Sequence, residues 1–359
     1  MGAALARTAP PSILPVYSPF AAAGVRRAVP RWSVSAAAFV PAGDAVTDLV
    51  QALIASATVL LGALGLAYWT HKAQSDRSAL VGLYLLLGIP ASLLTLAGAA
   101  LLLRGDRVLG PLLLLIGLGL GLPLLRPVRQ LLARVTPLDP DSAIDMAGLS
   151  LVLGLFGSQI GLSLAPLAEN PPETLPAVGI AQLLLQAAAF VAVAYIAVGY
   201  PYWRDLPAAT ERLGIVLPDP RTIGIAIVAT FASFAVAGLA GFAAQQLDPG
   251  LGESLDELVD QLTADIQNPV GAVILGATAG VGEEAFFRGA LQPRFGLVIP
   301  ALIFASLHGP QYGFNVALLG LFGVSIIFGL ERKYVNTTAA MITHALYNAL
   351  QVLALSAVS

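Results

Sequence analysis

The run SALVGLYLLLGIPASLLTLAGAALLL occupies residues 78–103 and contains no Asp, Glu, Lys, Arg or His. A helix of about 20 such residues crosses the roughly 30 Å hydrocarbon core of a bilayer. The whole chain shares this character, with 57% hydrophobic residues, 11% charged residues and a mean hydropathy of +0.82 over 359 residues. Soluble domains carry about 25% charged residues. A soluble fold of this length could not hide so much apolar surface, so the composition indicates an integral membrane protein.

Similar apolar runs alternate with short polar breaks from residue 45 onward. This pattern predicts an all-α fold, a polytopic bundle of about nine or ten membrane helices. The predicted spans are roughly 46–69, 78–103, 108–125, 146–167, 178–200, 222–247, 270–288, 296–308, 314–331 and 335–355. Within them, Gly117 and Gly121, and Gly157 and Gly161, have the four-residue spacing that lets membrane helices pack closely.

The chain divides into four predicted regions. Residues 1–43 contain six prolines and four arginines without a long apolar run, and we interpret them as a flexible N-terminal tail. Residues 44–247 hold N-terminal membrane helices without a motif that assigns a role. Residues 248–268 form an acidic break with interspersed leucines, which predicts an amphipathic connector outside the membrane. Residues 269–359 hold the last membrane helices and the ionisable groups described below.

Lys and Arg are unevenly distributed between alternate breaks. One set carries 12 of them and comprises 71–77, 126–145, 200–221, 288–294 and 331–333. The other set carries 2 and comprises 104–107, 168–176, 248–268 and 309–313. The positive-inside rule predicts that the first set faces the cytoplasm, although the basic tail falls on the opposite side. We expect a prokaryotic cell membrane as the location.

Composition also excludes some partners and sites. The net charge is −3 and the chain has no basic stripe, so we expect no nucleic-acid partner. Cysteine is absent, which rules out disulfides and thiolate metal sites.

Ionisable side chains within predicted spans are concentrated near the C-terminal end. Such groups cost roughly 2.5–3.5 kcal/mol each on insertion scales and are therefore functional candidates. The candidate residues, which also include a neighbouring amide, are Glu283, Glu284, Arg288, His308, His344 and Asn348.

Helical spacing suggests how some of these residues pair. Residues four apart share a helix face, so Glu284 can pair with Arg288, and His344 with Asn348. Glu283 and Glu284 point about 100° apart and cannot have the same role. We favour Glu284 as the partner of Arg288, with Glu283 facing a cavity. Geometry alone equally allows the reverse assignment.

Estimated depths place Glu283, His308 and His344 in the inner half of the bilayer, where they could meet in one cavity. Two imidazoles and a carboxylate are the ligand set of hydrolytic zinc sites. A divalent metal, most readily Zn²⁺, is therefore one hypothesis, with these three residues as ligands. Without metal, the same groups could act as general base and oxyanion donors.

Three short motifs on successive membrane helices carry a family resemblance. They are Glu-Glu-x-x-x-Arg at 283–288, Phe-x-x-x-His at 304–308 and His-x-x-x-Asn at 344–348. In this order they resemble the CPBP (ABI) family of intramembrane metalloproteases, related to the CAAX prenyl endopeptidase Rce and to bacteriocin-processing and immunity proteins. The resemblance covers about residues 270–355 and marks 269–359 as a CPBP-like catalytic domain.

The resemblance implies a role for each matching residue. Glu283 would activate the hydrolytic water with His308 beside it. His344 and Asn348 would bind the water or stabilise the oxyanion, and Glu284 and Arg288 would support the helix. The implied activity is endopeptidase cleavage of a membrane-associated peptide or lipidated protein substrate at a site open to the cytoplasmic side.

Two alternatives remain at the sequence level. A CPBP-like scaffold or immunity protein would keep the site but work by binding. An ion-coupled transporter would use the buried carboxylates and predicts inverted repeats, which the sequence does not show.

Overall fold

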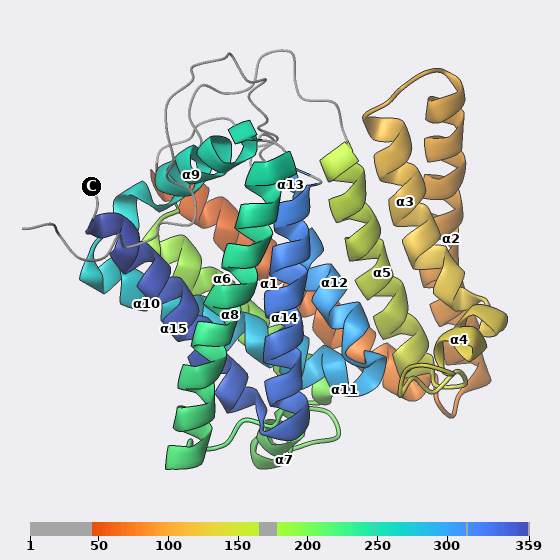
Figure 1. The fold of residues 1–359 in the computed structure, drawn as a ribbon. Coiled ribbons are helices and arrows are strands. Elements are labelled where there is room, and N and C mark those ends of the chain that lie inside the picture. Colours follow the sequence, from red (N-terminus) through yellow and green to blue (C-terminus); the bar gives the residue numbers. More distant parts are fainter. Residues whose placement is uncertain (1–44, 165–177, 248, 314, 358–359) are drawn as a thin grey trace, which may run out of the picture.

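The structure is a computed structural model that describes residues 45–164, 178–247, 249–313 and 315–357; the predicted tail at 1–43 lies outside them. Throughout this described part the secondary structure is helical, without a β-strand, which confirms the all-α prediction (Figure 1). The longer helices are α1 (Ala45–Lys72), α2 (Arg77–Leu103), α3 (Leu109–Gly121), α5 (Ala143–Leu164), α6 (Ile180–Val198), α8 (Pro220–Leu247), α9 (Pro249–Thr263), α10 (Pro269–Glu284), α14 (Val316–Tyr334) and α15 (Thr337–Ser356). The shorter ones are η1 (Leu122–Leu124), α4 (Arg126–Leu132), α7 (Leu206–Leu213), η2 (Ala264–Ile266), η3 (Ala285–Leu291), α11 (Gln292–Phe295), α12 (Val298–Ser306) and α13 (Gly309–Tyr312).

Each of the ten predicted spans coincides with a helix, but fewer of these helices are long and apolar enough to cross a membrane. Within the described ranges seven qualify, or eight if the pair Leu109–Leu124 and Arg126–Leu132, bent by 85°, counts as one broken span. By length and composition, this number of spans among the described residues is below the predicted nine or ten. Helix α12 has only 9 residues, and α14 ends in a charged turn containing Arg332 and Lys333.

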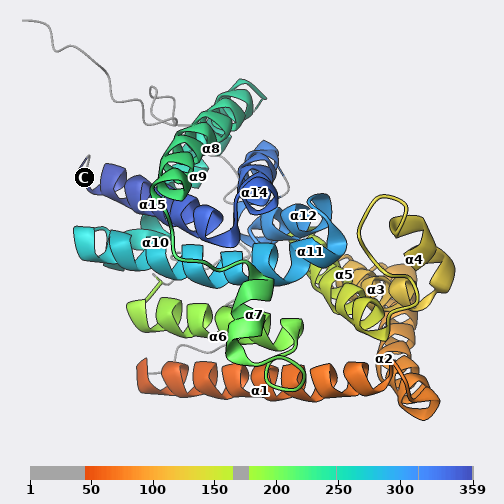
Figure 2. The same cartoon turned by 90° about the horizontal axis from the view of Figure 1, so that it is seen from below.

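A stack of helices, seen lengthwise and layered side by side in Figure 2, combines α1 with helices from the C-terminal half. Helix α1 packs on α6, α6 on α10, α10 on α15, and α15 on α8. Helix α14 lies against both α8 and α12. Helices α10 and α15 are thus central to the stack, with helices covering them on both sides.

Helices α2, α3 and α5 form a second group at one edge of the molecule (Figure 1). Small residues allow these helices to approach closely. A Cβ atom added at Gly157 would lie 2.2 Å from Leu115 O, and one added at Gly117 would lie 2.4 Å from Thr95 Oγ1. The predicted role of these glycines in helix packing is confirmed.

Glycines also allow close packing at the centre of the stack, between α10 and α15. A Cβ atom at Gly276 would lie 2.4 Å from Ala345 O, and one at Gly280 would lie 2.5 Å from Met341 O. These two glycines are four residues apart on α10 and bring its backbone against α15. The carboxylates at the end of α10 therefore lie close to the imidazole on α15.

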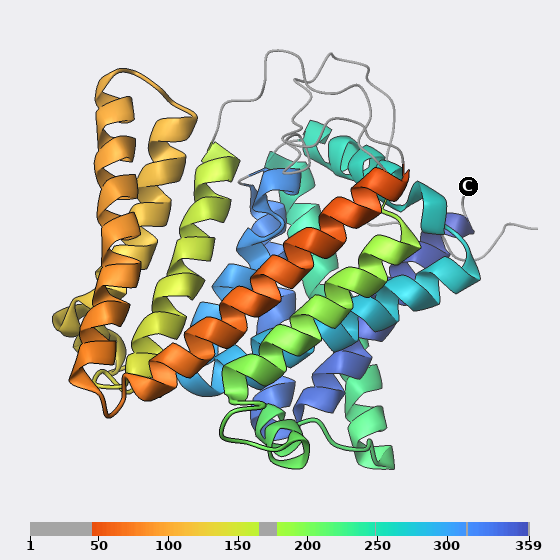
Figure 3. The ribbon, with the colours of Figure 1, turned by 180° about the vertical axis from the view of Figure 1, so that it is seen from behind.

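The basic breaks meet at one end of the bundle, where α4, α7 and α11 lie in Figures 1 and 3. Contacts between breaks confirm the shared end. Arg294 forms an ion pair with Asp145, Thr337 N donates to Gly214 O at 3.0 Å, and Gln74 Nε2 donates to Ser142 Oγ at 3.1 Å. We call this the basic end.

The acidic break at 248–268 is largely helical: α9 spans Pro249–Thr263 and η2 continues to Ile266. Helix α9 lies at the end of the bundle opposite α7 (Figure 1). A helix in this break agrees with the predicted amphipathic connector.

Candidate active site

Helix α10 delivers two carboxylates to the interior of the bundle. It begins at Pro269, where the side chain of the N-cap Asn268 accepts a hydrogen bond from Gly271 N at 2.9 Å. It ends at Glu284 and continues directly into the π-helix η3, a widened turn of a kind that is frequent at functional sites. The arrangement fixes the carboxylates at a junction between two helical geometries.

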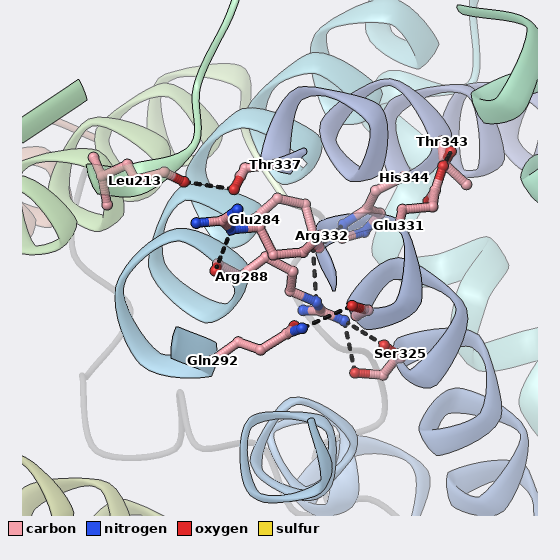
Figure 4. Close-up of polar contacts among 11 residues, drawn as sticks. Leu213, Glu284, Arg288, Gln292, Ser325, Glu331, Arg332, Thr337, Thr343 and His344 are labelled. Atoms are coloured by element: carbon pink, nitrogen blue, oxygen red, sulfur yellow. Dashed lines mark hydrogen bonds and ion pairs between the residues drawn. The ribbon is translucent and has the colours of Figure 1, made fainter. Parts of the chain in front are cut away.

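Glu284 and Arg288 form the ion pair that the sequence analysis favoured. Glu284 Oε2 lies 3.0 Å from Arg288 Nε, and the two side chains are 0% and 1% exposed. Arg288 Nη2 also donates to Ser325 O at 2.9 Å and to Ser325 Oγ at 2.7 Å (Figure 4). Full burial makes each charge dependent on the other, because an unpaired ion in this environment is very costly.

The same carboxylate also holds His344, which the sequence did not predict. Glu284 Oε1 accepts a hydrogen bond from His344 Nδ1 at 2.8 Å. With Glu284 Oε2 paired to Arg288, Oε1 is the acceptor of this bond and Nδ1 is its donor. The imidazole is further fixed by stacking on Phe328, with ring centroids 4.9 Å apart. Nε2 is therefore the nitrogen of His344 that remains for substrate or water.

His308 is fixed in a similar way at the end of α12. Its Nδ1 lies 3.1 Å from Phe304 O, and a carbonyl oxygen can only accept, so Nδ1 carries the proton. In the neutral ring Nε2 is then the hydrogen-bond acceptor. Phe304 contacts both imidazoles, at centroid distances of 5.4 Å to His308 and 5.7 Å to His344. The two histidines thus flank one aromatic ring.

Glu283 differs from Glu284 in its burial and in its partners. Its side chain is half-buried, and it makes no hydrogen bond or ion pair with the described residues. Its carboxylate lies within electrostatic range of His344, Glu284 and Arg288. His308 is in turn within electrostatic range of His344. Glu283 and His308 are thus each within electrostatic range of His344.

Asn348 lies one turn after His344 on α15 and is half-buried. No hydrogen bond joins the two side chains within the described residues, so the possible pairing drawn from their spacing is absent. The amide shares the helix face of His344 and keeps its donors for another partner.

Glu283, His308 and His344 were predicted as ligands of one divalent metal ion. Each histidine uses Nδ1 in a hydrogen bond and leaves Nε2, a pattern common among metal-binding imidazoles. The described part of the chain nevertheless contains no group of three or more His, Asp or Glu placed to hold one ion. Glu283, His308 and His344 therefore do not form a three-ligand site in this arrangement.

Glu331 is a buried carboxylic group that the sequence analysis did not select. It is 5% exposed, and its Oε1 lies 2.7 Å from Thr343 Oγ1, which itself lies 3.1 Å from Ala226 O. The threonine hydroxyl has one proton for two acceptors, so both contacts are hydrogen bonds only when Glu331 is protonated. These two contacts connect α14, α15 and α8 at the residue that precedes His344. The position of Glu331 one residue before a basic turn gave no sequence signal.

A cavity of about 680 Å³ opens between α8 and α14. Its walls are mainly apolar, and Arg221, Glu331 and Tyr334 contribute its ionisable side chains. None of the predicted site residues lines it. Glu331 is thus reached from this cavity as well as bonded to Thr343.

Comparison with known proteins agrees with the geometry. Residues 265–350 match the family model described as type II CAAX prenyl endopeptidase Rce1-like. No curated protein and no solved structure gave a match to this chain. The matched segment contains all six site residues and the helices that hold them. Residues 265–350 thus match an Rce1-like domain, and this match supports the resemblance of the C-terminal segment to the CPBP/CAAX protease-like family.

Proposed function

We propose that the protein hydrolyses a peptide bond in a membrane-associated or lipidated substrate, with Glu283 as general base. The observation that supports this proposal is that the two adjacent carboxylates have different surroundings. Glu284 is engaged by Arg288 through an ion pair and by His344 through a hydrogen bond, whereas Glu283 is half-buried and without a partner in the described chain. A carboxylate in this state can accept a proton from water.

The proposed reaction begins with a water molecule between Glu283 and His308. Glu283 removes a proton as the water oxygen bonds to the scissile carbonyl carbon, and the carbonyl electrons move to its oxygen. The C–N bond then breaks, and Glu283 returns the proton to the leaving amine. Nε2 of His308 accepts a hydrogen bond from the water and orients it.

His344 and Asn348 are the proposed oxyanion donors. His344 can donate from Nε2 only when both ring nitrogens are protonated, because Nδ1 is already committed to Glu284. The Glu284 carboxylate stabilises that imidazolium. Preorganised donors of this kind contribute about 2.7–4 kcal/mol each to transition-state binding in other hydrolases.

The substrate class follows from the surroundings of the site. A site enclosed by membrane helices favours a peptide that enters along the bilayer, attached to it by an apolar segment or a lipid. The proposed location is a prokaryotic cell membrane, with the site open on the cytoplasmic side. This orientation is supported by the concentration of Lys and Arg at the basic end.

The decisive experiment uses purified full-length protein and a library of lipidated and unmodified peptides in lipid nanodiscs. Glu283→Ala and His344→Ala are compared with the wild type and with His71→Gln, a histidine outside the site. Cleavage is expected to fall by about 10²–10⁴-fold for Glu283→Ala and to persist for His71→Gln. Bound metal is measured on the same samples. Equal cleavage by all four proteins would refute the site assignment.

A further inference from the structure

Four arginines from separate elements converge at the basic end. Arg212 on α7 lies within electrostatic range of Arg204, Arg294 and Arg332, which come from the α6–α7 connection, α11 and the end of α14. The guanidinium of Arg332 lies directly against Gly214, the C-cap of α7, where an added Cβ would be 2.6 Å from Arg332 Cζ. All four side chains are half-buried. We call them the arginine cluster. Its members are far apart in sequence, so only folding concentrates their charge.

The cluster has too few negative partners. Asp145 is the one carboxylate of the described residues that acts on Arg212, and it already pairs with Arg294. Arg204 donates to Val198 O, and Arg332 Nε donates to Arg288 O at 3.3 Å. Arg212 itself makes no hydrogen bond or ion pair within the described chain. On α7, Asp205 caps the helix and Glu211 is exposed.

Desolvation and the neighbouring positive charges lower the pKa of Arg212 below its usual value. An arginine stays protonated regardless, so the cluster keeps its excess charge. Half-buried guanidinium groups with unused donors are suited to a multiply hydrogen-bonding anion such as a phosphate.

Aromatic residues beside the cluster indicate its depth. Trp203, next to Arg204, stacks on His71 with ring centroids 4.4 Å apart, and Tyr202 lies 5.6 Å from Tyr68. Tyr68 and Tyr202 are 55% and 44% exposed. Exposed Tyr and Trp at the ends of membrane helices mark the headgroup layer. The arginine cluster therefore lies at the level of lipid phosphates.

From this arrangement we propose that the arginine cluster binds the phosphate headgroup of an anionic phospholipid in the leaflet at the basic end. Basic pockets between membrane helices recognise such headgroups. Arg332 joins the cluster to the backbone of Arg288 on η3, the helix that directly follows Glu284. Binding is measured without turnover, so the proposal is tested independently of peptidase activity.

The test uses delipidated full-length protein in neutral detergent. It is titrated with phosphatidylglycerol, with phosphatidylcholine of the same chain length, and with inorganic phosphate, and binding is followed by native mass spectrometry. Phosphatidylglycerol is expected to bind at least about tenfold more tightly than the other two, because headgroup charge and acyl contact act together. Arg212→Gln is expected to weaken this binding by about tenfold, through loss of a charge-assisted hydrogen bond.

Matched variants separate the cluster from general surface charge. Arg134→Gln removes an exposed arginine at the same end and should leave lipid binding unchanged. An unchanged Tm for lipid-free Arg212→Gln would show that the fold persists. If Arg212→Gln reduced the Tm, Arg212→Lys would serve instead, with weakened but measurable binding.

Two results would overturn the proposal. One is equal phosphatidylglycerol binding by the wild type and Arg212→Gln. The other is Arg212-dependent binding of a peptide with a free C-terminal carboxylate, but not of its amide, without binding of the lipid. The cluster would then be a contact for a peptide carboxylate.

Discussion

The side chain of Glu284 links α10, η3 and α15. One of its oxygens pairs with Arg288 and the other accepts from His344, at full burial. The residue is therefore a positioning group whose charge is needed by both neighbours. Glu283 is one position away but points about 100° around the helix, where it meets no partner among the described residues.

The substitution Glu284→Gln tests this positioning role. A neutral amide at this position cannot balance the charge of Arg288, so the variant is expected to lose about 3–5 kcal/mol of stability, seen as a lower Tm in detergent. Glu283→Gln is the control, because an unpaired, half-buried carboxylate should be replaceable with little change in Tm. Comparable stability of the two variants would contradict the assigned roles.

Glu331 provides a second test at the residue scale. If Glu331 is protonated, Glu331→Gln retains a donor toward Thr343 Oγ1. The free energy of unfolding of this variant should then lie within about 1 kcal/mol of the wild-type value. Glu331→Ala leaves a cavity and an unsatisfied hydroxyl and should cost about 2–4 kcal/mol. Thermal unfolding of both variants distinguishes these cases. An equal loss in both would mean that the ionised carboxylate is required.

At the scale of elements, the contact between α10 and α15 determines the site. Carboxylates on the first helix reach the imidazole on the second because Gly276 and Gly280 remove the side chains that would separate them. The π-helix η3 then turns Arg288 back toward Glu284 and Ser325. Neither contact depends on a loop.

Gly280→Ala tests this helix contact. Its Cβ would lie 2.5 Å from the Met341 carbonyl oxygen, a backbone atom that cannot rotate away. We expect a loss of about 1–3 kcal/mol in stability and a larger loss of peptidase activity, because the Glu284–His344 distance lengthens. Gly62→Ala on α1, where a Cβ meets nothing within 4 Å, is the matched control and should behave like the wild type. A stable, fully active Gly280→Ala protein would contradict this account.

At the scale of the whole molecule, the breaks rich in Lys and Arg meet at one end of the bundle. This supports the prediction that alternate breaks lie on opposite sides of the membrane. The chain contains no cysteine, so single cysteines can report the side of each break. Arg134→Cys and Glu211→Cys are expected to react with a membrane-impermeant maleimide only after cell lysis. Arg107→Cys, exposed in the α2–α3 connection, should react in intact cells. Labelling of all three from one side would rule out the topology.

Much of the architecture was predictable because its cause is local. Apolar length fixed the positions of the helices, since a backbone in lipid must satisfy its own hydrogen bonds. Fewer helices of the described residues qualify as spans than the apolar runs predicted: the run at 296–308 is itself short, and the bend of 85° after α3 is a feature that hydropathy does not encode. The pairing of Glu284 with Arg288 was favoured from spacing, because four residues is a distance within one helix.

The sequence by itself determined that this protein lies in a membrane, where its helices are and which six residues are candidates for the chemistry. Tertiary structure alone decided that Glu284 also holds His344, that Glu331 ties three helices together and that four distant arginines meet. These contacts span from 12 to more than 100 residues along the chain. No periodicity encodes such distances, because they depend on which helix faces pack together and how closely their backbones approach.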